Sequence, residues 1–311
     1  MKRISLIITF TLLMLMAVVG SFSLLMLTAR SAYAHPAGTP INETRSAKAD
    51  GEVRVSNVAG SVTVRGWDKA QVHVSGTLGA GTQRLDVSSD GSGVSIRVIL
   101  PQHSHSNVEG TDLVIDVPKA SRLTVNTVSA DISASGLTGI EHLESVSGNL
   151  SLDSRSSDIG AQSVSGEVNI SGSASRAHIR AHSISGDVKI SGVDGELVAE
   201  SVSSTVKVTA SNLSRAQLSS TSGNVDFAAT IGTGGSYEFH SISGNLNLSF
   251  AKLPDARFDI SSFSGNITNS IGPKATRTSE YGPGMELHFT SGHGDAQVNA
   301  KTLSGNISLR D

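Results

Sequence analysis

Apolar and polar residues alternate along most of the chain after residue 50, and the alternation restarts every 18 to 21 residues. Each restart carries a short motif, Ser-x-Ser-Gly, in which x is usually apolar. Around Val164, the residues Gly166, Val168 and Ile170 share its parity, and the opposite parity is polar. A period of two with β-branched residues predicts a strand with one buried face. We therefore expect the x residues, among them Val164, Ile184 and Ile242, to face the interior.

A second strand precedes each motif. Ala161 and Ile159, which lie three and five residues before Val164, are one example, and their phase differs from that of the following strand. A change of phase between two inward-facing strands indicates a corner. The x residues that mark the repeat are Val58, Val128, Val146, Val164, Ile184, Val202, Thr221, Ile242, Phe263 and Leu303.

The repeat length decides the fold class. About twenty residues is too short for a strand–helix–strand crossover, which needs about 30, and no apolar period of 3.6 follows residue 34. Repeats of this kind bury their apolar faces by stacking on one another. The sequence predicts an all-β fold, namely a parallel β-solenoid with about 18–21 residues per rung.

The motif glycine lies on the inward parity, and Ala130 and Ser204 replace it in two repeats. Alanine and serine do not readily adopt positive φ. The position is therefore expected to require a small inward side chain at a narrow corner. The structural repeat positions predicted in this way are Gly148, Gly166, Gly186, Gly223, Gly244, Gly265 and Gly305.

Two segments interrupt the repeat. Residues 66–120 contain "RLDVSSDGSGVSIRVIL", which predicts an antiparallel meander that covers the N-terminal end of the stack. Residues 269–284 read as a loop, after which "MELHFTSG" and "DAQVNAKTLSGNISLR" are expected to rebuild the last rungs. We assign the first rung and the meander to residues 50–125 and the repeat solenoid to residues 126–311.

The N-terminus predicts export. A basic start, an apolar run and small residues at Ala32 and Ala34 are typical of a secretory signal peptide spanning residues 1–34. The alternative is an uncleaved anchor, because the apolar run is long enough to span a bilayer. Residues 35–49 are polar and read as a flexible leader. Either reading places the rest outside the cytoplasm, in the periplasm, on the cell surface or in the medium.

The amino-acid composition excludes several kinds of site and partner. The chain has no cysteine, which excludes disulfides, thiolate metal sites and cysteine nucleophiles. Charged residues make up 16% and the formal net charge is -3, so a nucleic-acid partner is not expected. The pair His103 and His105, with Glu109 nearby, lacks the further ligands that a metal site needs. No cofactor is predicted.

A polar residue follows each motif glycine, and in a stack these residues form an outward column. One interpretation is a ladder of side-chain hydrogen bonds between rungs. The other is that Glu167 and Asp187, one rung apart, form a carboxylate pair or a cation site, since retaining glycosidases hold two carboxyl groups about 5 Å apart. A repeating column is typical of packing, and no unique constellation accompanies it. We assign no catalytic residue; Glu167 and Asp187 are the candidates. The column comprises Asp131, Asn149, Glu167, Asp187, Asn224, Asn245, Asn266 and Asn306.

Three other residue sets read as structural. The outward serines, such as Ser165, cannot all have the base and oxyanion hole that a nucleophile needs. Tyr237 and Phe239 lie on the inward parity and should be core. His178 and His182 are expected on opposite sides of the strand alternation or its corner, which makes a shared site improbable.

The sequence resembles a bacterial family of β-strand-repeat proteins that bears the name "putative adhesin" and is otherwise a domain of unknown function. The resemblance covers about residues 50–311. It rests on "GEVRVSNVAGSVTVRGW", "GTDLVIDVPKASRLTVNTVSADISASG", the reiterated S-[VI]-S-G-[ND]-[VLI] and the closing "TLSGNISLR". It implies an exported β-solenoid and carries over no catalytic residues.

The sequence thus predicts an exported, non-enzymatic cell-envelope protein that presents Ser/Asn/Thr-rich faces to polysaccharide or protein. One alternative is a polysaccharide-active β-helix enzyme that uses outward carboxylates. Another is an envelope-stress accessory protein held by an uncleaved N-terminal helix. The ligand itself is not predicted.

Overall fold

The fold is all-β, as predicted. The computed structural model describes residues 38–101 and 109–311, and within them it has 24 strands and no helix. The predicted signal segment 1–34 and the His103–His105 pair lie outside these residues. The N-terminal strands are β1 (Pro40–Ser46), β2 (Glu52–Asn57), β3 (Gly60–Trp67), β4 (Gln71–Thr77), β5 (Arg84–Ser89), β6 (Gly93–Ile99) and β7 (Thr111–Pro118).

The remaining strands belong to the repeat region. They are β8 (Arg122–Thr127), β9 (Asp131–Ser135), β10 (Glu141–Ser145), β11 (Leu150–Asp153), β12 (Asp158–Ser163), β13 (Val168–Ser171), β14 (Ala177–Ser183), β15 (Val188–Ser201), β16 (Val206–Ser220), β17 (Val225–Ser241), β18 (Leu246–Phe250), β19 (Ala256–Ser262), β20 (Ile267–Asn269), β21 (Thr276–Arg277), β22 (Met285–Ser291), β23 (Ala296–Thr302) and β24 (Ile307–Arg310).

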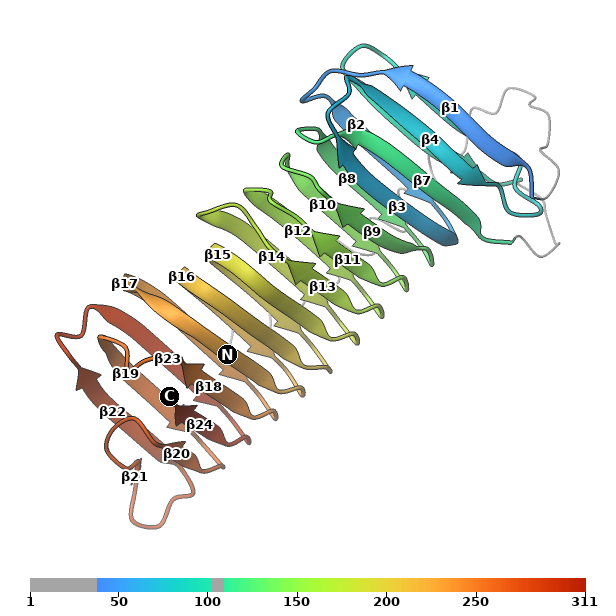
Figure 1. The fold of residues 1–311 in the computed structure, drawn as a ribbon. Helices are drawn as coiled ribbons and strands as arrows, with labels where there is room; N and C mark the ends of the chain where they lie inside the picture. The colour runs from blue at the N-terminus through green and yellow to red at the C-terminus, as the bar shows by residue number, and fades with distance from the viewer. Residues whose placement is uncertain (1–37, 102–108) are drawn as a thin grey trace.

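All strands belong to one large sheet in an elongated, solenoid-like stack (Figure 1). The chain alternates between two faces that meet at the Ser-x-Ser-Gly corners. We call the strands that run into a corner the incoming face; they are β2, β8, β10, β12, β14, the C-terminal halves of β15, β16 and β17, and β19 and β23. We call those that leave it the outgoing face; they are β3, β9, β11, β13, the N-terminal halves of β15, β16 and β17, and β18, β20 and β24.

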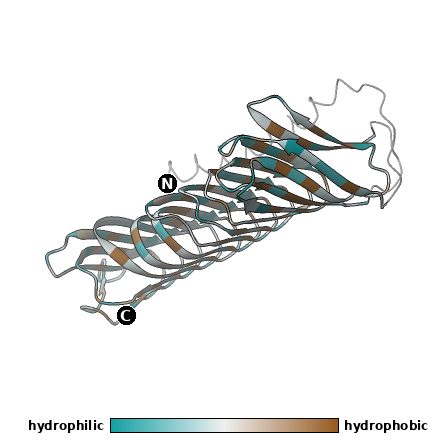
Figure 2. Ribbon diagram, turned by 45° about the horizontal axis from the view of Figure 1, so that its top comes forward, coloured by the Kyte–Doolittle hydropathy of each residue, from teal (hydrophilic) through white to brown (hydrophobic). Residues whose placement is uncertain are grey.

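Equivalent residues of successive rungs pair in parallel and in register. On the incoming face Ile159 lies beside Ile179, and on the outgoing face Val168 lies beside Val188. These side chains point between the two faces and are almost fully buried. Apolar and polar residues alternate along the strands (Figure 2), so the two faces share a dry interior while their outer sides stay polar. Tyr237 and Phe239 are buried there, as predicted.

The corner corrects one prediction. Val164 and Ile184 are only half-buried and Ile242 is exposed, whereas the first serine of each motif is buried. The inward parity of the incoming strand continues through Ser163, so the phase changes between Ser163 and the motif glycine. The buried hydroxyl residues are Thr127, Ser145, Ser163, Ser183, Ser201, Ser220, Ser241, Ser262 and Thr302.

The buried hydroxyl satisfies backbone groups that the corner would otherwise leave unpaired. The Gly166 N–H donates to Ser163 Oγ at 2.9 Å, and Ser163 Oγ donates to the carbonyl of Gly148 on the preceding rung at 3.2 Å. Ser183 repeats both bonds with Gly186 and Gly166. Unpaired buried backbone groups are costly, so this serine closes each corner and ties it to the one before.

The corner glycine is small for the predicted reason. None of the seven predicted repeat glycines has a positive φ. A Cβ on Gly166 would overlap the carbonyl oxygen of Gly148, and the same overlap recurs between Gly186 and Gly166. The backbones of successive corners therefore approach too closely for a larger inward side chain.

The N-terminal end differs in part from the prediction. β5 and β6 form the expected antiparallel hairpin, but β6 and β7 pair in parallel with β2 and β3, which makes them another rung outside the first. Antiparallel strands β4 and β1 then extend this end. The leader prediction is wrong for residues 40–46, since they form β1.

The C-terminal end also departs from chain order. β23 lies between β17 and β19, and β24 lies between β18 and β20, so residues 296–310 form a rung inserted inside the stack. In Figure 1 the C-terminus accordingly lies beside β24 and not at the tip. The segment "MELHFTSG" does not rebuild a rung; its strand β22 pairs antiparallel with β19 and closes the incoming face.

One carboxyl group is buried in the interior. Glu141 on β10 has no exposed surface; Ser154 Oγ donates to its Oε1, and its Oε2 has no partner. Burial raises the pKa of Glu141 to about 7, and the bond from Ser154 opposes this only in part. The group therefore costs stability when it ionises.

We predict that Glu141→Gln removes a pH dependence of stability. The raised pKa means that the folded state binds the proton more tightly, so the free energy of unfolding is highest below about pH 4.5 and falls as the pH rises through about 7. The variant should be more stable than the wild type at pH 8.5, by up to about 3 kcal/mol, and should differ little at pH 4.5. Urea unfolding at both pH values measures this. The exposed Glu280→Gln is the control, and an equal pH profile for wild type and Glu141→Gln would contradict the prediction.

We also predict that the two serines of one motif differ sharply. Ser163→Ala leaves the Gly166 N–H and the Gly148 carbonyl without their partner and should lower the free energy of unfolding by about 1–3 kcal/mol. The matched control Ser165→Ala alters an exposed side chain and should change it by less than about 0.5 kcal/mol. Chemical unfolding followed by circular dichroism measures both; equal losses would disprove this role of the buried hydroxyl.

Candidate functional site

The outgoing face presents a flat row of small polar side chains. Its central outward position is occupied on successive rungs mainly by Ser, Thr or Asn, with Lys189, Lys207 and Asp226 in the middle of the rod. Parallel pairing in register spaces these groups by about 4.8 Å. In spatial order the row is Thr63, Ser133, Ser151, Asn169, Lys189, Lys207, Asp226, Asn247, Ser308 and Thr268.

Much of the column after the motif glycine forms a hydrogen-bonded ladder between rungs. The Asn149 N–H donates to Asp131 Oδ1 at 2.7 Å, and the Glu167 N–H donates to Asn149 Oδ1 at 2.9 Å. In these links a backbone N–H donates to a side-chain oxygen of the neighbouring rung, and Asn245 Nδ2 in addition donates to Asn224 Oδ1 at 3.3 Å. The ladder also follows the inserted rung, because Asn306 accepts from Asn266 and donates to Asn245.

The candidate carboxylates share a lysine. Lys189 Nζ lies 2.9 Å from Glu167 Oε1 and 3.8 Å from Asp187 Oδ2. The hydrogen bond to Glu167 raises the pKa of Lys189, with both carboxylates contributing. Asp187 Oδ1 in addition accepts the Thr205 N–H at 3.1 Å. Both acids therefore pair with an exposed cation, and Asp187 alone also accepts a hydrogen bond of the ladder.

The incoming face carries a row of histidines beside carboxylates that the sequence did not reveal. His182 Nε2 lies 3.1 Å from Glu200 Oε2, and His178 Nδ1 lies 3.5 Å from Glu196 Oε2. Burial lowers the pKa of His182, and the charge of Glu200 opposes the shift. The expectation that His178 and His182 lie on different sides is wrong: both point outward from β14. Each faces its own glutamate on the next rung, which only the register of β14 with β15 reveals.

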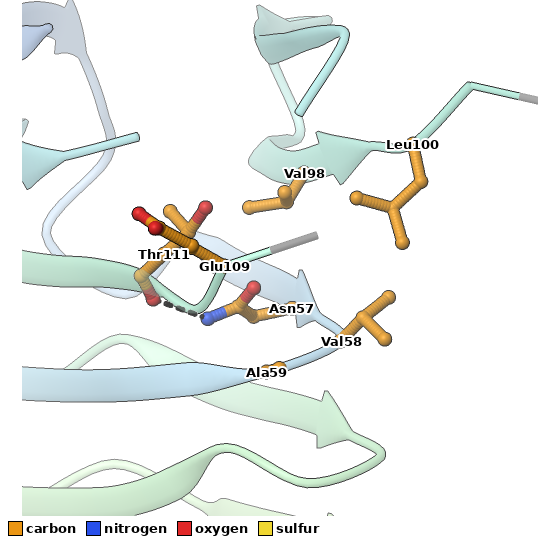
Figure 3. Close-up of a pocket in the computed structure, with 7 residues that line it drawn as sticks. All are labelled: Asn57, Val58, Ala59, Val98, Leu100, Glu109 and Thr111. Carbon is orange, nitrogen blue, oxygen red and sulfur yellow. Dashed lines mark hydrogen bonds between the residues drawn. The ribbon is translucent and has the colours of Figure 1, made fainter. Parts of the chain in front are cut away.

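A small cavity lies near the N-terminal end (Figure 3). It has a volume of about 60 Å³, far below the 300–1,000 Å³ of typical ligand pockets. Asn57 Nδ2 donates to the Thr111 carbonyl at 2.8 Å, and Asn57 Oδ1 is buried without a partner. Asn57 occupies the place of the buried corner serine. The lining residues are Asn57, Val58, Ala59, Val98, Leu100, Glu109 and Thr111.

Three further observations bear on function. In residues 38–101 and 109–311 no three His, Asp or Glu side chains are grouped to hold a metal ion. The same residues contain no helix of the length and apolar character needed to cross a membrane. Trp67 is half-buried: its Nε1 donates to the Gln71 carbonyl at 2.8 Å and Lys69 Nζ lies 4.6 Å from its ring. It serves as an anchor of the β3–β4 turn.

Several solved structures are similar to the chain. A "putative adhesin" from Bacteroides fragilis is 12% identical, covers 88% of this chain and 98% of its own, and has a TM-score of 0.44. A "putative lipid binding protein" from Parabacteroides distasonis is 12% identical, covers 88% and 97%, and has a TM-score of 0.41. A "putative cell adhesion protein" from Clostridium sporogenes is 9% identical, covers 88% and 99%, and has a TM-score of 0.25.

The comparison with curated proteins gave no match. The comparison with protein families matched one family, described as Toastrack DUF4097, over residues 52–310. This range contains the first rung, the antiparallel N-terminal strands except β1, and every Ser-x-Ser-Gly corner. The chain belongs to the Toastrack family of domains of unknown function.

Proposed function

We propose that the protein is an exported, non-enzymatic cell-envelope protein, a parallel β-solenoid rod that binds polysaccharide or protein through its outgoing face. The observation that supports this most directly is the row of hydroxyl and amide side chains held in register on that face. Such a row offers many equivalent hydrogen-bond donors and acceptors on a rigid surface.

The chemistry of the row favours a polymeric ligand. Each Ser, Thr or Asn contact with a hydroxyl-rich ligand is weak, because it replaces contacts with water. A repeating ligand meets several rungs at once, and the later contacts form at a high effective concentration. The cavity beside Asn57 is too small for a polymer, so binding is expected along the face and not in that cavity.

Catalysis by Glu167 and Asp187 is the weaker alternative. A glycosidase needs one protonated and one ionised carboxyl group on either side of a bond. Here the two acids do not flank an open space, because Lys189 Nζ contacts both of them. The site also lies on an open face, without the enclosure that strengthens electrostatic catalysis. The second alternative, an anchored envelope-stress accessory protein, depends on whether residues 1–34 are cleaved.

We predict that charge on the outgoing face weakens binding. The double variant Ser133→Glu/Ser151→Glu should lose at least tenfold in affinity for the polysaccharide or protein that the wild type retains on glycan and protein arrays, about 1.4 kcal/mol. The matched control is Gln162→Glu/Gln217→Glu, which adds the same charge to the incoming face. Equal losses in both variants, or none in the first, would contradict the proposed binding face.

The enzymatic alternative has its own test. Glu167→Ala/Asp187→Ala should leave retention on the same arrays within about twofold, and neither this variant nor the wild type should release soluble products from the glycans. Glycan cleavage by the wild type that disappears in the double variant would overturn the proposal. Sequencing the mature N-terminus tests export, because an intact Met1 would favour the anchored protein.

A further inference from the structure

From Val128 onward the half-exposed and exposed x residues form a line along the corner edge of the rod, and all of them except Thr221 are apolar. On each rung the N–H of the second serine donates to the carbonyl of the preceding x residue, for example Ser165 to Val146 and Ser185 to Val164. We call this line the corner ridge; in spatial order it consists of Val128, Val146, Val164, Ile184, Val202, Thr221, Ile242, Leu303 and Phe263.

The exposure of the ridge rises toward the C-terminal end. Ile242, Leu303 and Phe263 are 39%, 49% and 64% exposed, and they occupy three consecutive rungs because residues 296–310 are inserted between β17 and β19. In the described chain only Leu253 and Tyr281 are other exposed large apolar side chains. Contiguous apolar surface of this kind on a soluble protein marks an interaction site.

The regular spacing of the ridge residues suits a second copy of the same chain as the binding partner. One apolar side chain recurs about every 4.8 Å along a straight edge. A second copy of the chain carries the same line with the same spacing, so the two ridges can match over their whole length. A two-fold axis parallel to the rods would bring each ridge residue against its own counterpart and the largest ones together.

The polar side chains beside the ridge are compatible with this arrangement. On each rung, the residue two positions before x lies on the incoming side of the ridge and the residue three positions after x lies on its outgoing side. The two-fold axis places the first of these on one rod against the second on the other rod. No such pair joins two like charges, and His182 meets Asp187. The pairs are Asn126–Asp131, Glu144–Asn149, Gln162–Glu167, His182–Asp187, Glu200–Thr205, Ser219–Asn224, His240–Asn245, Lys301–Asn306 and Ser261–Asn266. An antiparallel pair centred on Val202 would instead bring Glu200 against its own copy.

The area needed sets the extent of the contact. A stable interface buries about 800 Å² per partner. The three exposed residues alone supply less than this, since a whole aromatic side chain buries only about 150–250 Å². The contact must therefore run along most of the ridge, with Ile242, Leu303 and Phe263 as its most strongly buried part.

We propose that two copies of the chain associate side by side and in parallel along the corner ridge. The pair leaves both outgoing faces free. This inference does not depend on the ligand or on the proposed function, and it concerns a different edge of the rod.

Cysteine cross-linking tests the arrangement, because the natural chain has no cysteine. Thr221→Cys should form a disulfide-linked dimer under mild oxidation, since position 221 meets its own copy and disulfides require Cβ atoms about 3.5–4.5 Å apart. The matched control is Thr209→Cys, exposed on the outgoing face, which should stay monomeric. Equal cross-linking of the two variants would overturn the proposal. A dimer that forms only when Thr221→Cys is mixed with Ile184→Cys would show antiparallel rods and overturn the parallel arrangement.

Sedimentation tests the ridge without cysteines. The wild type should show a concentration-dependent dimer, and Phe263→Ser/Leu303→Ser should raise the dissociation constant at least tenfold. Leu253→Ser, which removes an exposed leucine elsewhere, is the control and should leave it unchanged. All three replaced side chains are exposed, so unfolding midpoints should stay close to that of the wild type. A wild type that sediments as a monomer at about 100 μM would overturn the proposal. If such a monomer is retained on lipid vesicles and Phe263→Ser/Leu303→Ser lowers that retention, the ridge binds a membrane surface and not a second copy.

Discussion

The close approach of successive corners is the constraint on which the rest of the structure depends. At each of the seven corner glycines, a carbonyl oxygen of the neighbouring rung occupies the space that a Cβ would need, and two other repeats carry only Ala130 and Ser204 at this position. Only a minimal side chain fits, and a buried serine hydroxyl beside it binds both the glycine N–H and the carbonyl of the preceding rung. Because the corners are fixed at this spacing, the strands on either side pair in register.

That constraint divides the molecule into parts with different tasks. The interior holds the apolar residues, the corners hold the register, and the outward positions of the two faces are left to vary. The outgoing face uses this freedom for small hydroxyl and amide groups, whereas the incoming face places histidines such as His182 against glutamates such as Glu200. Under the proposed function, a ligand would bind along a face of the rod and not in a single cleft.

The sequence was sufficient for the fold class and the repeat, because the Ser-x-Ser-Gly spacing and the strand alternation act locally. It was misleading at the corner, where Val164 shares the parity of Val168 but lies on the outer side of the bend. The order of the last rungs could not be predicted from the sequence either. β23 and β19 carry equivalent patterns of apolar and polar residues, so no local feature indicates which of them pairs with β17. The Glu167–Asp187 pair was found from the sequence, but Lys189, which faces the same side of the strand as Asp187 and joins the two acids, was overlooked.

The inserted C-terminal rung has a consequence for how the molecule matures. Residues 296–310 are synthesised after both neighbours of this rung, and until then the neighbours must wait with an open gap between them. Completion of the rod is thus coupled to the arrival of residues 296–310. A chain without residues 296–310 would display unpaired strand edges on both sides of the gap, and such edges expose it to aggregation and to proteases that remove incompletely folded proteins.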